Sequence, residues 1–303
     1  MNQTVLITGG TGTIGRRLTQ LLQQQGYTVT CLSRSSVQGS PVKTYQWDVK
    51  RGHIDPQAIQ TADHIVHLAG AGIADERWTS ARKDEILGSR TESSELLARA
   101  LAKNPHTVKS FVASSAIGYY GGDTGDRPLT ETSSGGSDFL ARVTRAWEQS
   151  EDSVAALGIR TVKFRTGVVL TMAGGALPKL AQPIRLGAGA PIGSGQQYIS
   201  WIHIDDLCQL YLRAIQDESW QGVYNAVAPG PVTNETLTRA IAGVLDRPML
   251  LPNIPNFVIK LMFGELAITV IGGNYVLNKR LTEETDFKYQ FGDLDHALKD
   301  LLQ

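Results

Sequence analysis

Three glycines near the N-terminus have the spacing of a loop that binds the phosphates of a nucleotide. They follow an apolar run at 5–7 that is typical of a buried parallel strand, and a helix is expected to begin at about Thr13. The first glycine permits a tight turn, the second lets the backbone approach a pyrophosphate, and the third lets the helix pack close to the strand. The helix N-terminus adds unpaired N–H groups and the positive end of its dipole. The residues predicted to bind the cofactor here are Gly9, Thr11, Gly12, Thr13, Ile14 and Gly15.

The end of the second predicted strand, 28–33, indicates which dinucleotide is bound. An NAD enzyme usually has Asp or Glu at this point, where the carboxylate accepts hydrogen bonds from the ribose 2′-OH. This chain has Ser33 and Arg34 instead. A guanidinium can bind a 2′-phosphate through two hydrogen bonds, and the Ser33 hydroxyl can add another donor. The pattern favours NADP(H) over NAD(H); the alternative interpretation of Arg34 is an ordinary solvated loop residue.

Groups that could move a proton lie near the ends of two later strands. A phenol beside a positive charge has a lowered pKa and can exchange a proton while a hydride moves. The alternative is an aromatic pair that packs against the second half of the chain with its hydroxyls hydrogen-bonded. The predicted catalytic residues are Ser115, Tyr119 and Tyr120, which follow a predicted strand at 108–113, and Lys163, in a predicted strand at 159–164; Ser114 is predicted to contact the cofactor.

Strands and helices alternate through the first half of the chain, and this pattern predicts the scaffold for these residues. Alternation of this kind specifies a parallel sheet with helices on both faces and right-handed crossovers. We therefore expect an α/β fold with a doubly wound, Rossmann-type sheet over 1–165 and a smaller substrate lobe over 166–303, partly returning to the sheet. Further strands are predicted at 44–47 and 63–68. A long helical region is predicted to follow the second of these strands as far as residue 100, and another helix is predicted over 138–157.

Composition narrows the class of protein. The 303 residues contain 29 Lys plus Arg and 29 Asp plus Glu, so no excess charge indicates a nucleic-acid partner. Two cysteines provide neither a disulfide framework nor a zinc site, and no metal is expected. The apolar stretch 257–271 is interrupted by Lys260 and Glu265, which predicts a packed helix rather than a membrane span. Without a signal-peptide pattern, we expect a cytoplasmic protein with a small-molecule substrate and no membrane partner; a homodimer is among the candidate assemblies.

Several longer strings resemble one known family. The chain is similar to the epimerase-family oxidoreductases of the extended and atypical short-chain dehydrogenase/reductase superfamily, which carry a small C-terminal domain, here about 250–303. This resemblance implies an NAD(P)-binding fold and leaves the reaction open. The matching strings are HLAGAGI at 67–73, RKDEILGSR at 82–90, SSAIGYYG at 114–121, FRTGVVL at 164–170, GSGQQYISWIHIDDL at 193–207 and NAVAP at 225–229.

Two further groups of residues are predicted beside the cofactor and the substrate. Leu68, Ala69 and Gly70 follow a predicted strand, and their small side chains let the adenosine half lie against the backbone; by resemblance, Glu85 and Arg90 on the next helix also reach the cofactor. Asp205 or Asp206 is expected to cap a helix, with His203 as an interior histidine. A mixture of aromatic and cationic groups is expected on the substrate side, namely Arg77, Trp78, Arg185, Gln197, Tyr198 and Trp201.

The chain lacks the catalytic Tyr/Lys pair of the superfamily. Short-chain dehydrogenases use a Tyr and, four residues later, a Lys that lowers the pKa of the Tyr; here Phe139 and Val143 have that spacing. Two functions therefore stay open. One is an NADP(H)-dependent oxidoreductase or epimerase that acts on a small polar or sugar-like substrate. The other is a dinucleotide-binding sensor or regulator without turnover.

Overall fold

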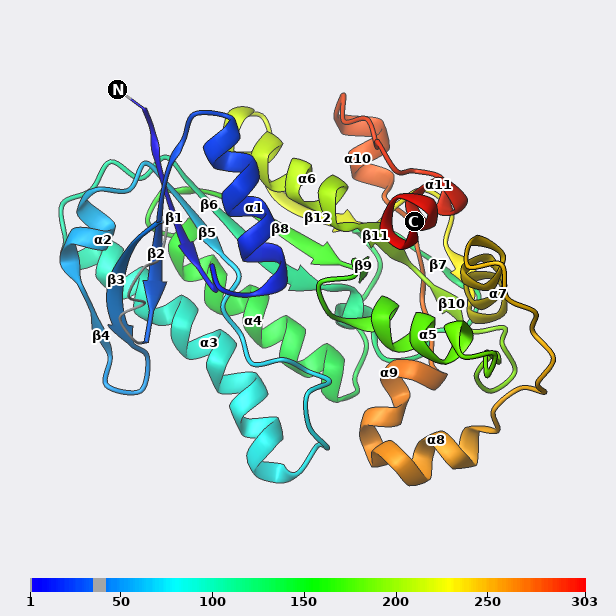
Figure 1. Ribbon diagram of the computed structural model, residues 1–303. Helices are drawn as coiled ribbons and strands as arrows, with labels where there is room; N and C mark the ends of the chain where they lie inside the picture. The colour runs from blue at the N-terminus through cyan, green and yellow to red at the C-terminus, as the bar shows by residue number, and fades with distance from the viewer. Residues whose placement is uncertain (1, 35–41) are drawn as a thin grey trace.

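The computed structural model describes residues 2–34 and 42–303 and consists of a large sheet covered by helices with a second lobe at one end (Figure 1). The sheet has eight strands in the order β12-β8-β6-β5-β1-β2-β3-β4, and its pairings are parallel except for β3 with β4. The prediction of a doubly wound parallel sheet is confirmed. The strands are β1 (Thr4–Thr8), β2 (Thr28–Ser33), β3 (Lys43–Asp48), β4 (His53–Ile54), β5 (His64–His67), β6 (Ser110–Ala116), β8 (Arg160–Thr166) and β12 (Gly222–Ala226).

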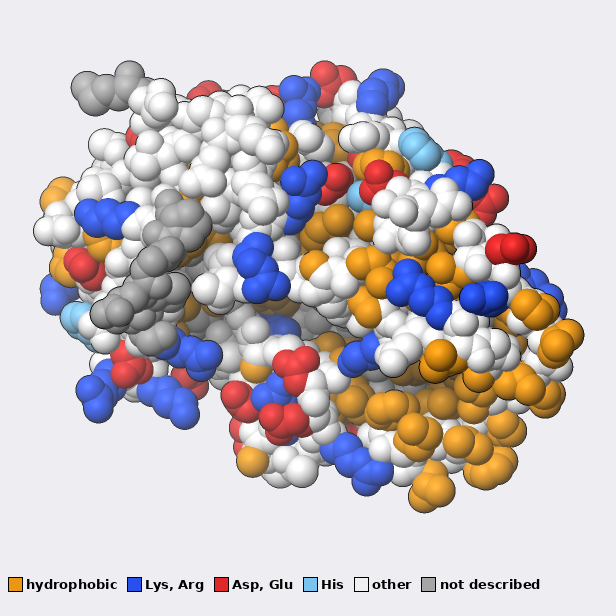
Figure 2. Space-filling model, viewed as in Figure 1, with side chains coloured by type: hydrophobic (Ala, Val, Ile, Leu, Met, Phe, Trp, Pro, Cys, Tyr) orange, Lys and Arg blue, Asp and Glu red, His pale blue; other side chains and the backbone are white. Residues whose placement is uncertain are grey.

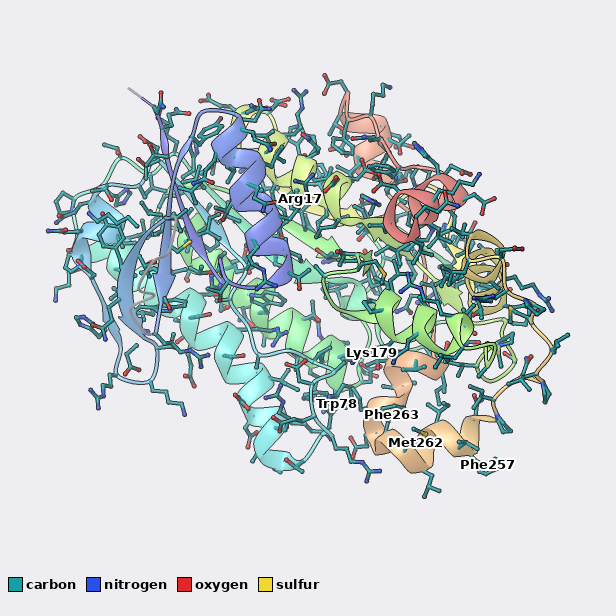
Figure 3. The ribbon with its side chains drawn as sticks, viewed as in Figure 1. Arg17, Trp78, Lys179, Phe257, Met262 and Phe263 are labelled. Atoms are coloured by element: carbon teal, nitrogen blue, oxygen red, sulfur yellow. The ribbon has the colours of Figure 1, made fainter. Side chains whose placement is uncertain are left out.

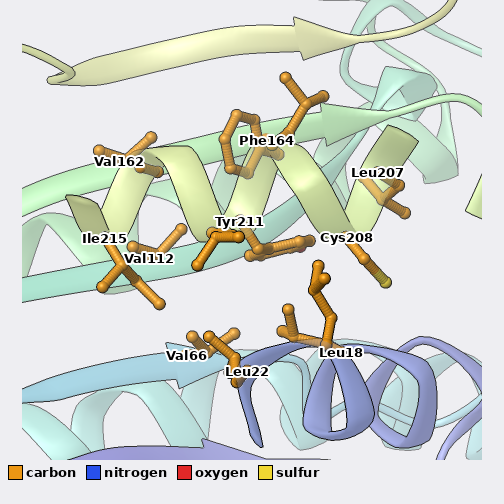
Figure 4. Packing of buried hydrophobic residues seen from close by; sticks show 14 of the residues in the cluster. Leu18, Leu22, Val66, Val112, Val162, Phe164, Leu207, Cys208, Tyr211 and Ile215 are labelled. Atoms are coloured by element: carbon orange, nitrogen blue, oxygen red, sulfur yellow. The ribbon is translucent and has the colours of Figure 1, made fainter. Parts of the chain in front are cut away.

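Helices on both faces form two hydrophobic cores with the sheet. On one face, Leu18 and Leu22 of α1 and Tyr211 of α6 pack against Val66 and Phe164 of the sheet (Figure 4). The spacing of Leu18, Leu21 and Leu22 puts these side chains on one side of α1, which is why this helix lies flat on the strands. On the opposite face, α2, α3 and α4 pack against the sheet. The sheet-covering helices are α1 (Thr13–Gln24), α2 (Pro56–Gln60), α3 (Ser80–Lys103), α4 (Phe139–Ala155) and α6 (Ile204–Gln216).

The second lobe is built from short elements around a third core, which contains Leu177, Trp201 and Leu298, and a smaller cluster, which contains Tyr120, Leu129 and Val276. Its strands are β7 (Pro128–Leu129), β9 (Val168–Leu170), β10 (Tyr198–Ile199), β11 (Trp201–His203), β13 (Val232–Thr233) and β14 (Tyr275–Val276). Its helices are α5 (Ala176–Arg185), α7 (Asn234–Val244), α8 (Asn256–Phe263), α9 (Ile268–Ile271), α10 (Lys279–Glu284) and α11 (Leu294–Leu302), with 3-10 helices η1 (Ile117–Tyr120) and η2 (Gly264–Ala267).

The structure corrects two local predictions. His203, not Asp205 or Asp206, is the N-cap of α6, because its Nδ1 accepts the Asp205 N–H at 3.1 Å. Asp205 instead pairs with Arg17 of α1, and Asp206 accepts two N–H groups from the loop before α11. His203 itself is buried, as predicted.

The apolar stretch 257–271 is not one packed helix. It is divided by Gly264 into α8, η2 and α9, and most of α8 is exposed. Within the described part of the chain, no helix combines the length and the apolar character needed to cross a bilayer.

Candidate functional site

The loop between β1 and α1 depends on glycine at two of its three predicted positions. Gly9 has φ +70°, and a Cβ there would lie 2.9 Å from the carbonyl carbon of Leu68. A Cβ on Gly15 would lie 2.7 Å from Cα of Gly10, so this glycine lets α1 pack against the turn. Both residues are therefore required by the backbone itself.

Gly12 differs, because the protein leaves space beside it. Within the described part of the chain, a Cβ at Gly12 would meet only the Gly9 carbonyl oxygen, at 3.2 Å, and Gly12, as the N-cap of α1, has no side chain to accept the first N–H groups of the helix. Thr11 and Gly12 are exposed, and Thr13 and Ile14 are half-buried. The open side of Gly12 and the N–H groups that begin α1 fit a pyrophosphate.

A loop of the second lobe lies beside this helix N-terminus. A Cβ built on Gly174, between β9 and α5, would lie 3.1 Å from Oγ1 of Thr13. Any ligand held at Gly12 is therefore adjacent to both lobes, and the predicted phosphate loop lies between them.

Ser33 and Arg34 lie at the carboxyl ends of the sheet strands, on the same side of the sheet as the glycine loop. β1 and β2 are parallel with Thr8 opposite Leu32, so the residues after each strand emerge side by side. Arg34 is exposed and Ser33 is half-buried. Residues 35–41, which follow, lie outside the described part of the chain.

The loop after β5 is tied to β1 by the Thr8 side chain. Thr8 Oγ1 accepts the N–H groups of Leu68 and Ala69, each at 3.1 Å, and lies 2.7 Å from Nδ1 of His67. The imidazole Nε2 lies 3.2 Å from the hydroxyls of Ser93 and Ser94 on α3. Burial lowers the pKa of His67 to about 3, so the ring is neutral and can accept at one nitrogen and donate at the other.

The two α3 residues named by resemblance lie differently. The Arg90 side chain approaches Gly70, where a Cβ would lie 3.2 Å from the guanidinium carbon, and it stacks 4.9 Å from the Trp147 ring centroid. Burial lowers the pKa of Arg90 to about 10. Glu85 is exposed and pairs with Arg82 at 2.7 Å. The Arg90 side chain thus lies beside the predicted cofactor loop, and Glu85 is linked to the residues that follow this loop through Arg82, which donates to the Gly72 carbonyl at 2.6 Å.

A buried ionic network lies below the ends of β6 and β8. Arg165 donates from Nε and Nη2 to the two carboxylate oxygens of Glu148, at 2.8 and 2.9 Å. Ser115 donates to Glu148 Oε1 at 2.6 Å, which commits its hydroxyl to this carboxylate. Burial acts to lower the pKa of Arg165, but the hydrogen bonds and charge of Glu148 outweigh it and the pKa is raised. Arg165 is therefore a permanent cation held in place by Glu148.

The two predicted tyrosines have unequal surroundings. The Tyr120 hydroxyl is buried among Asn225 Oδ1 at 2.7 Å, the Thr130 carbonyl at 3.0 Å and Arg165 Nη1 at 3.1 Å. Burial raises the pKa of Tyr120, despite Arg165. Tyr120 is thus a structural residue in this conformation.

Tyr119 is half-buried and lies against the same cation. The Arg165 guanidinium carbon is 3.3 Å from the centroid of the Tyr119 ring, and the Tyr120 ring meets its edge. Among the described contacts, none engages the Tyr119 hydroxyl in a hydrogen bond.

Lys163 does not approach the tyrosines. Its Nζ donates to the Glu148 carbonyl at 2.5 Å and to Asp152 at 2.6 Å, on the side of α4. The cation beside the phenols is Arg165, which sequence reasoning missed. The available signal was the spacing, because Arg165 lies two residues after Lys163 and so shares its face of the strand. The structure pairs Arg165 with Ser115, whereas Lys163 pairs with Ala113, further from the strand end.

Phe139 begins α4 and lies in an aromatic group. Its ring meets Trp78 edge-on at 4.9 Å, and Lys83 lies over it at 5.3 Å. Arg77 donates to the carbonyls of Leu261 and Met262, which joins the loop after β5 to the end of α8.

Of the remaining residues predicted on the substrate side, some pack inside the second lobe and one is exposed on the surface. Trp201 is buried in the core of the second lobe, Tyr198 packs edge-on against Tyr275, and Gln197 donates to the carbonyls of Ile192 and Val270. Arg185 is exposed at the end of α5. Of the predicted set, Arg77 connects the loop after β5 to the second lobe, whereas Trp78 packs against Phe139 at the start of α4.

Two family models match the chain. Residues 5–226 match the NAD dependent epimerase/dehydratase family, and residues 254–301 match a domain of unknown function, DUF1731. The chain is 35% identical over 301 residues to the human epimerase family protein SDR39U1, covering 98% of this chain and 99% of that protein. It is 34% identical over 300 residues to the epimerase family protein YfhF of Bacillus subtilis, covering 98% and 97%.

A solved relative has the same fold throughout. A crystal structure of human SDR39U1 with NADPH is similar to this chain with a TM-score of 0.87 and 36% identity, covering 99% of each chain. The UDP-N-acetylglucosamine 4-epimerase from Bacillus cereus has a TM-score of 0.77 at 16% identity, a likeness that concerns the fold alone. The resemblance inferred from the sequence strings is confirmed.

Proposed function

This chain belongs to the NAD-dependent epimerase/dehydratase family, and we propose that it is an NADP(H)-dependent oxidoreductase that acts on a small polar substrate, sugar-like molecules included. The observation that carries the proposal is the buried Arg165 beside Tyr119, because it provides a phenol with a fixed cation where the Tyr/Lys pair of the superfamily is absent.

The cofactor fits the residues at the edge of the sheet. The N–H groups at the start of α1 would hold the pyrophosphate, the backbone of Leu68, Ala69 and Gly70 would line the dinucleotide, and Arg34 would bind a 2′-phosphate. The similar human protein was crystallised with NADPH, which supports the choice of NADP(H). When bound, the nicotinamide ring supplies or accepts a hydride.

Tyr119 is the proposed proton donor of this site. The Arg165 guanidinium lies against the face of the Tyr119 ring, and this cation–π contact fixes the position of the ring and of its hydroxyl. Glu148 keeps the guanidinium in this position through two hydrogen bonds. Ser115, Tyr120 and Lys163 then support the network through their internal hydrogen bonds.

A carbonyl-compound screen with NADPH tests the proposal, followed by two matched variants. Tyr119→Phe should lower kcat by about 10²–10⁴-fold and leave NADPH affinity unchanged, because only the proton donor is removed. Tyr120→Phe removes the neighbouring hydroxyl and should lower the melting temperature with a far smaller effect on kcat. Equal turnover by Tyr119→Phe and wild type would refute the role of Tyr119.

A non-catalytic regulator is the second candidate function. It is favoured by Phe139, which stands with Trp78 where the superfamily has its Tyr, and by the internal hydrogen bonds of three of the four predicted catalytic residues. NADPH binding without oxidation of NADPH by any carbonyl compound in the screen would favour this function over the oxidoreductase.

A further inference from the structure

Exposed hydrophobic side chains gather on one part of the second lobe. Of the nine large hydrophobic residues recorded as exposed in the described part of the chain, seven lie at 186 and 250–263 (Figure 2). Leu250, Leu261 and Phe257 are the most exposed of the α8 region, at 82%, 78% and 70%. We call this set the α8 patch, and its members are Leu186, Leu250, Leu251, Phe257, Leu261, Met262 and Phe263.

The α8 patch is held in a defined position. Ile259 is the residue of α8 that is buried against the body, and the helix packs on η2. The carbonyls at the end of α8 accept hydrogen bonds from Arg77, and Lys83 pairs with Glu265 just beyond it. Figure 3 places Phe257, Met262 and Phe263 along this helix, at the edge of the molecule away from the large sheet. The apolar side chains are thus presented by an anchored helix.

A groove runs beside the apolar ridge of α8. It has a volume of about 630 Å³, and Ala267, Ile268 and Ile271 provide its apolar lining. Its charged lining residues are Lys260, Asp123 and Glu265. One face of the molecule therefore carries a ridge, a groove, a cation and two carboxylates.

We propose that the α8 patch is the interface between two copies of this chain. A two-fold interface joins one surface to itself, so it needs complementary features on a single face, and a ridge beside a groove with charges of both signs meets that need. Monomers rarely expose continuous apolar patches of more than a few hundred Å², whereas a standard interface buries about 800 Å² on each partner. In the pair, the Phe257–Leu261 ridge of one copy lies in the groove of the other.

The charges favour a second copy over a lipid surface. An anionic membrane attracts basic side chains around an apolar helix, but here Asp123 and Glu265 line the groove next to the patch. Glu265 already pairs with Lys83 of its own chain, so in a second copy Lys260 supplies the cation that Asp123 can face. The proposal is independent of the proposed oxidoreductase function.

Sedimentation equilibrium of the full chain tests the interface. Wild type should have twice the 32.8 kDa mass of one chain, and Leu261→Glu and Phe257→Ser should each return it to one chain mass. Leu157→Glu is the matched control, because Leu157 is 43% exposed and lies outside the patch, and it should remain dimeric. Both patch residues point into solvent in the single chain, so circular dichroism and NADPH titration should match wild type.

A labelling experiment locates the contact directly. Cys31 and Cys208 are buried, so a maleimide should react with a cysteine introduced by Met262→Cys, and with the control Leu157→Cys. Dilution from the dimeric to the monomeric range should speed labelling at position 262 by about tenfold and leave position 157 unchanged. A monomeric wild type, concentration-independent labelling at 262, or Leu261-dependent flotation with phosphatidylglycerol vesicles in place of dimerisation would each overturn the proposal.

Discussion

Replacing Thr8 by Val should separate the role of the β5 loop in cofactor binding from its role in folding. Thr8 is fully buried, and Val has nearly the same shape without the hydroxyl. In the native chain the hydroxyl oxygen accepts two N–H groups and can donate its hydrogen to Nδ1 of His67. The substitution therefore removes three hydrogen bonds while leaving the packing nearly intact.

The loss of stability in Thr8→Val depends on which hydrogen-bond partners remain. The Leu68 N–H keeps the Thr8 backbone carbonyl at 3.2 Å, but the Ala69 N–H and His67 Nδ1 lose the partner recorded for them. Each unsatisfied buried group costs about 1–3 kcal/mol, and half-buried Ala69 can recover part of this from water, so we expect a loss of about 2–4 kcal/mol. NADPH affinity should fall about tenfold, because the loop predicted to line the dinucleotide is no longer held against β1.

Thermal unfolding and fluorescence titration with NADPH measure the two effects. Thr8→Ser keeps the hydroxyl and should bind NADPH almost as wild type does. Ser110→Ala is the matched control for stability, because Ser110 bonds Nδ1 of His64, another buried histidine of β5, at 2.8 Å and away from the loop. It should destabilise the chain without weakening NADPH binding. The reasoning is refuted if Thr8→Val and Ser110→Ala lose stability alike and both keep wild-type affinity.

The sheet could be predicted because its signals are local. The apolar run before Gly9 and the alternation of strands with helices contain the information for parallel pairing, and β1, β2 and β5 lie within a residue of their predicted limits. Short β4 was not predicted, because a two-residue strand has no periodicity to detect. β12 pairs with β8 from the second half of the chain, a partnership that no local pattern specifies.

The ionic network shows where sequence reasoning stops. β8 continues to Thr166, two residues beyond its predicted end, and this extension brings Arg165 rather than Lys163 to the level of Ser115. Alternate residues of a strand share a face, so both cations point toward α4, but Lys163 meets Asp152 while Arg165 lies at Tyr119 and Tyr120. An error of two residues in a strand end thus selects a different cation for the site.

The exposure of the apolar stretch 257–271 could not be predicted from its composition. The apolar content of 257–271 predicted a helix packed against the rest of the chain. Hydrophobic side chains favour burial, but the sequence does not specify which surface buries them. Ile259 meets the body of this chain, and Leu261, two residues later, is exposed. The pattern on α8 is compatible with both a core helix and an interface helix, and only the position of the rest of the fold distinguishes them.

Three further predictions concern the nucleotide site and the buried carboxyl group of α4. Arg34→Ala should weaken NADPH binding at least about tenfold and leave NADH binding unchanged in a fluorescence titration, because a charge-assisted hydrogen bond contributes roughly 1.5–3 kcal/mol; an equal loss for both nucleotides would contradict this. Gly12→Ala should fold but bind NADPH poorly, whereas Gly15→Ala should lower the melting temperature measured by circular dichroism, since its Cβ meets the Gly10 backbone; the reverse order would place the phosphate elsewhere. Glu151 is fully buried, neither of its carboxyl oxygens has a hydrogen-bond partner among the described residues, and burial raises its pKa well above the ordinary value despite Lys163. Because the folded pKa exceeds the unfolded one, folding binds a proton, and stability is lost as the pH rises from about 4.3 toward the folded value. Glu151→Gln cannot ionise, so its stability advantage over wild type in urea unfolding should grow by about 1.4 kcal/mol per pH unit across that window and then level off; a constant difference would mean that the carboxyl is ionised in the folded chain.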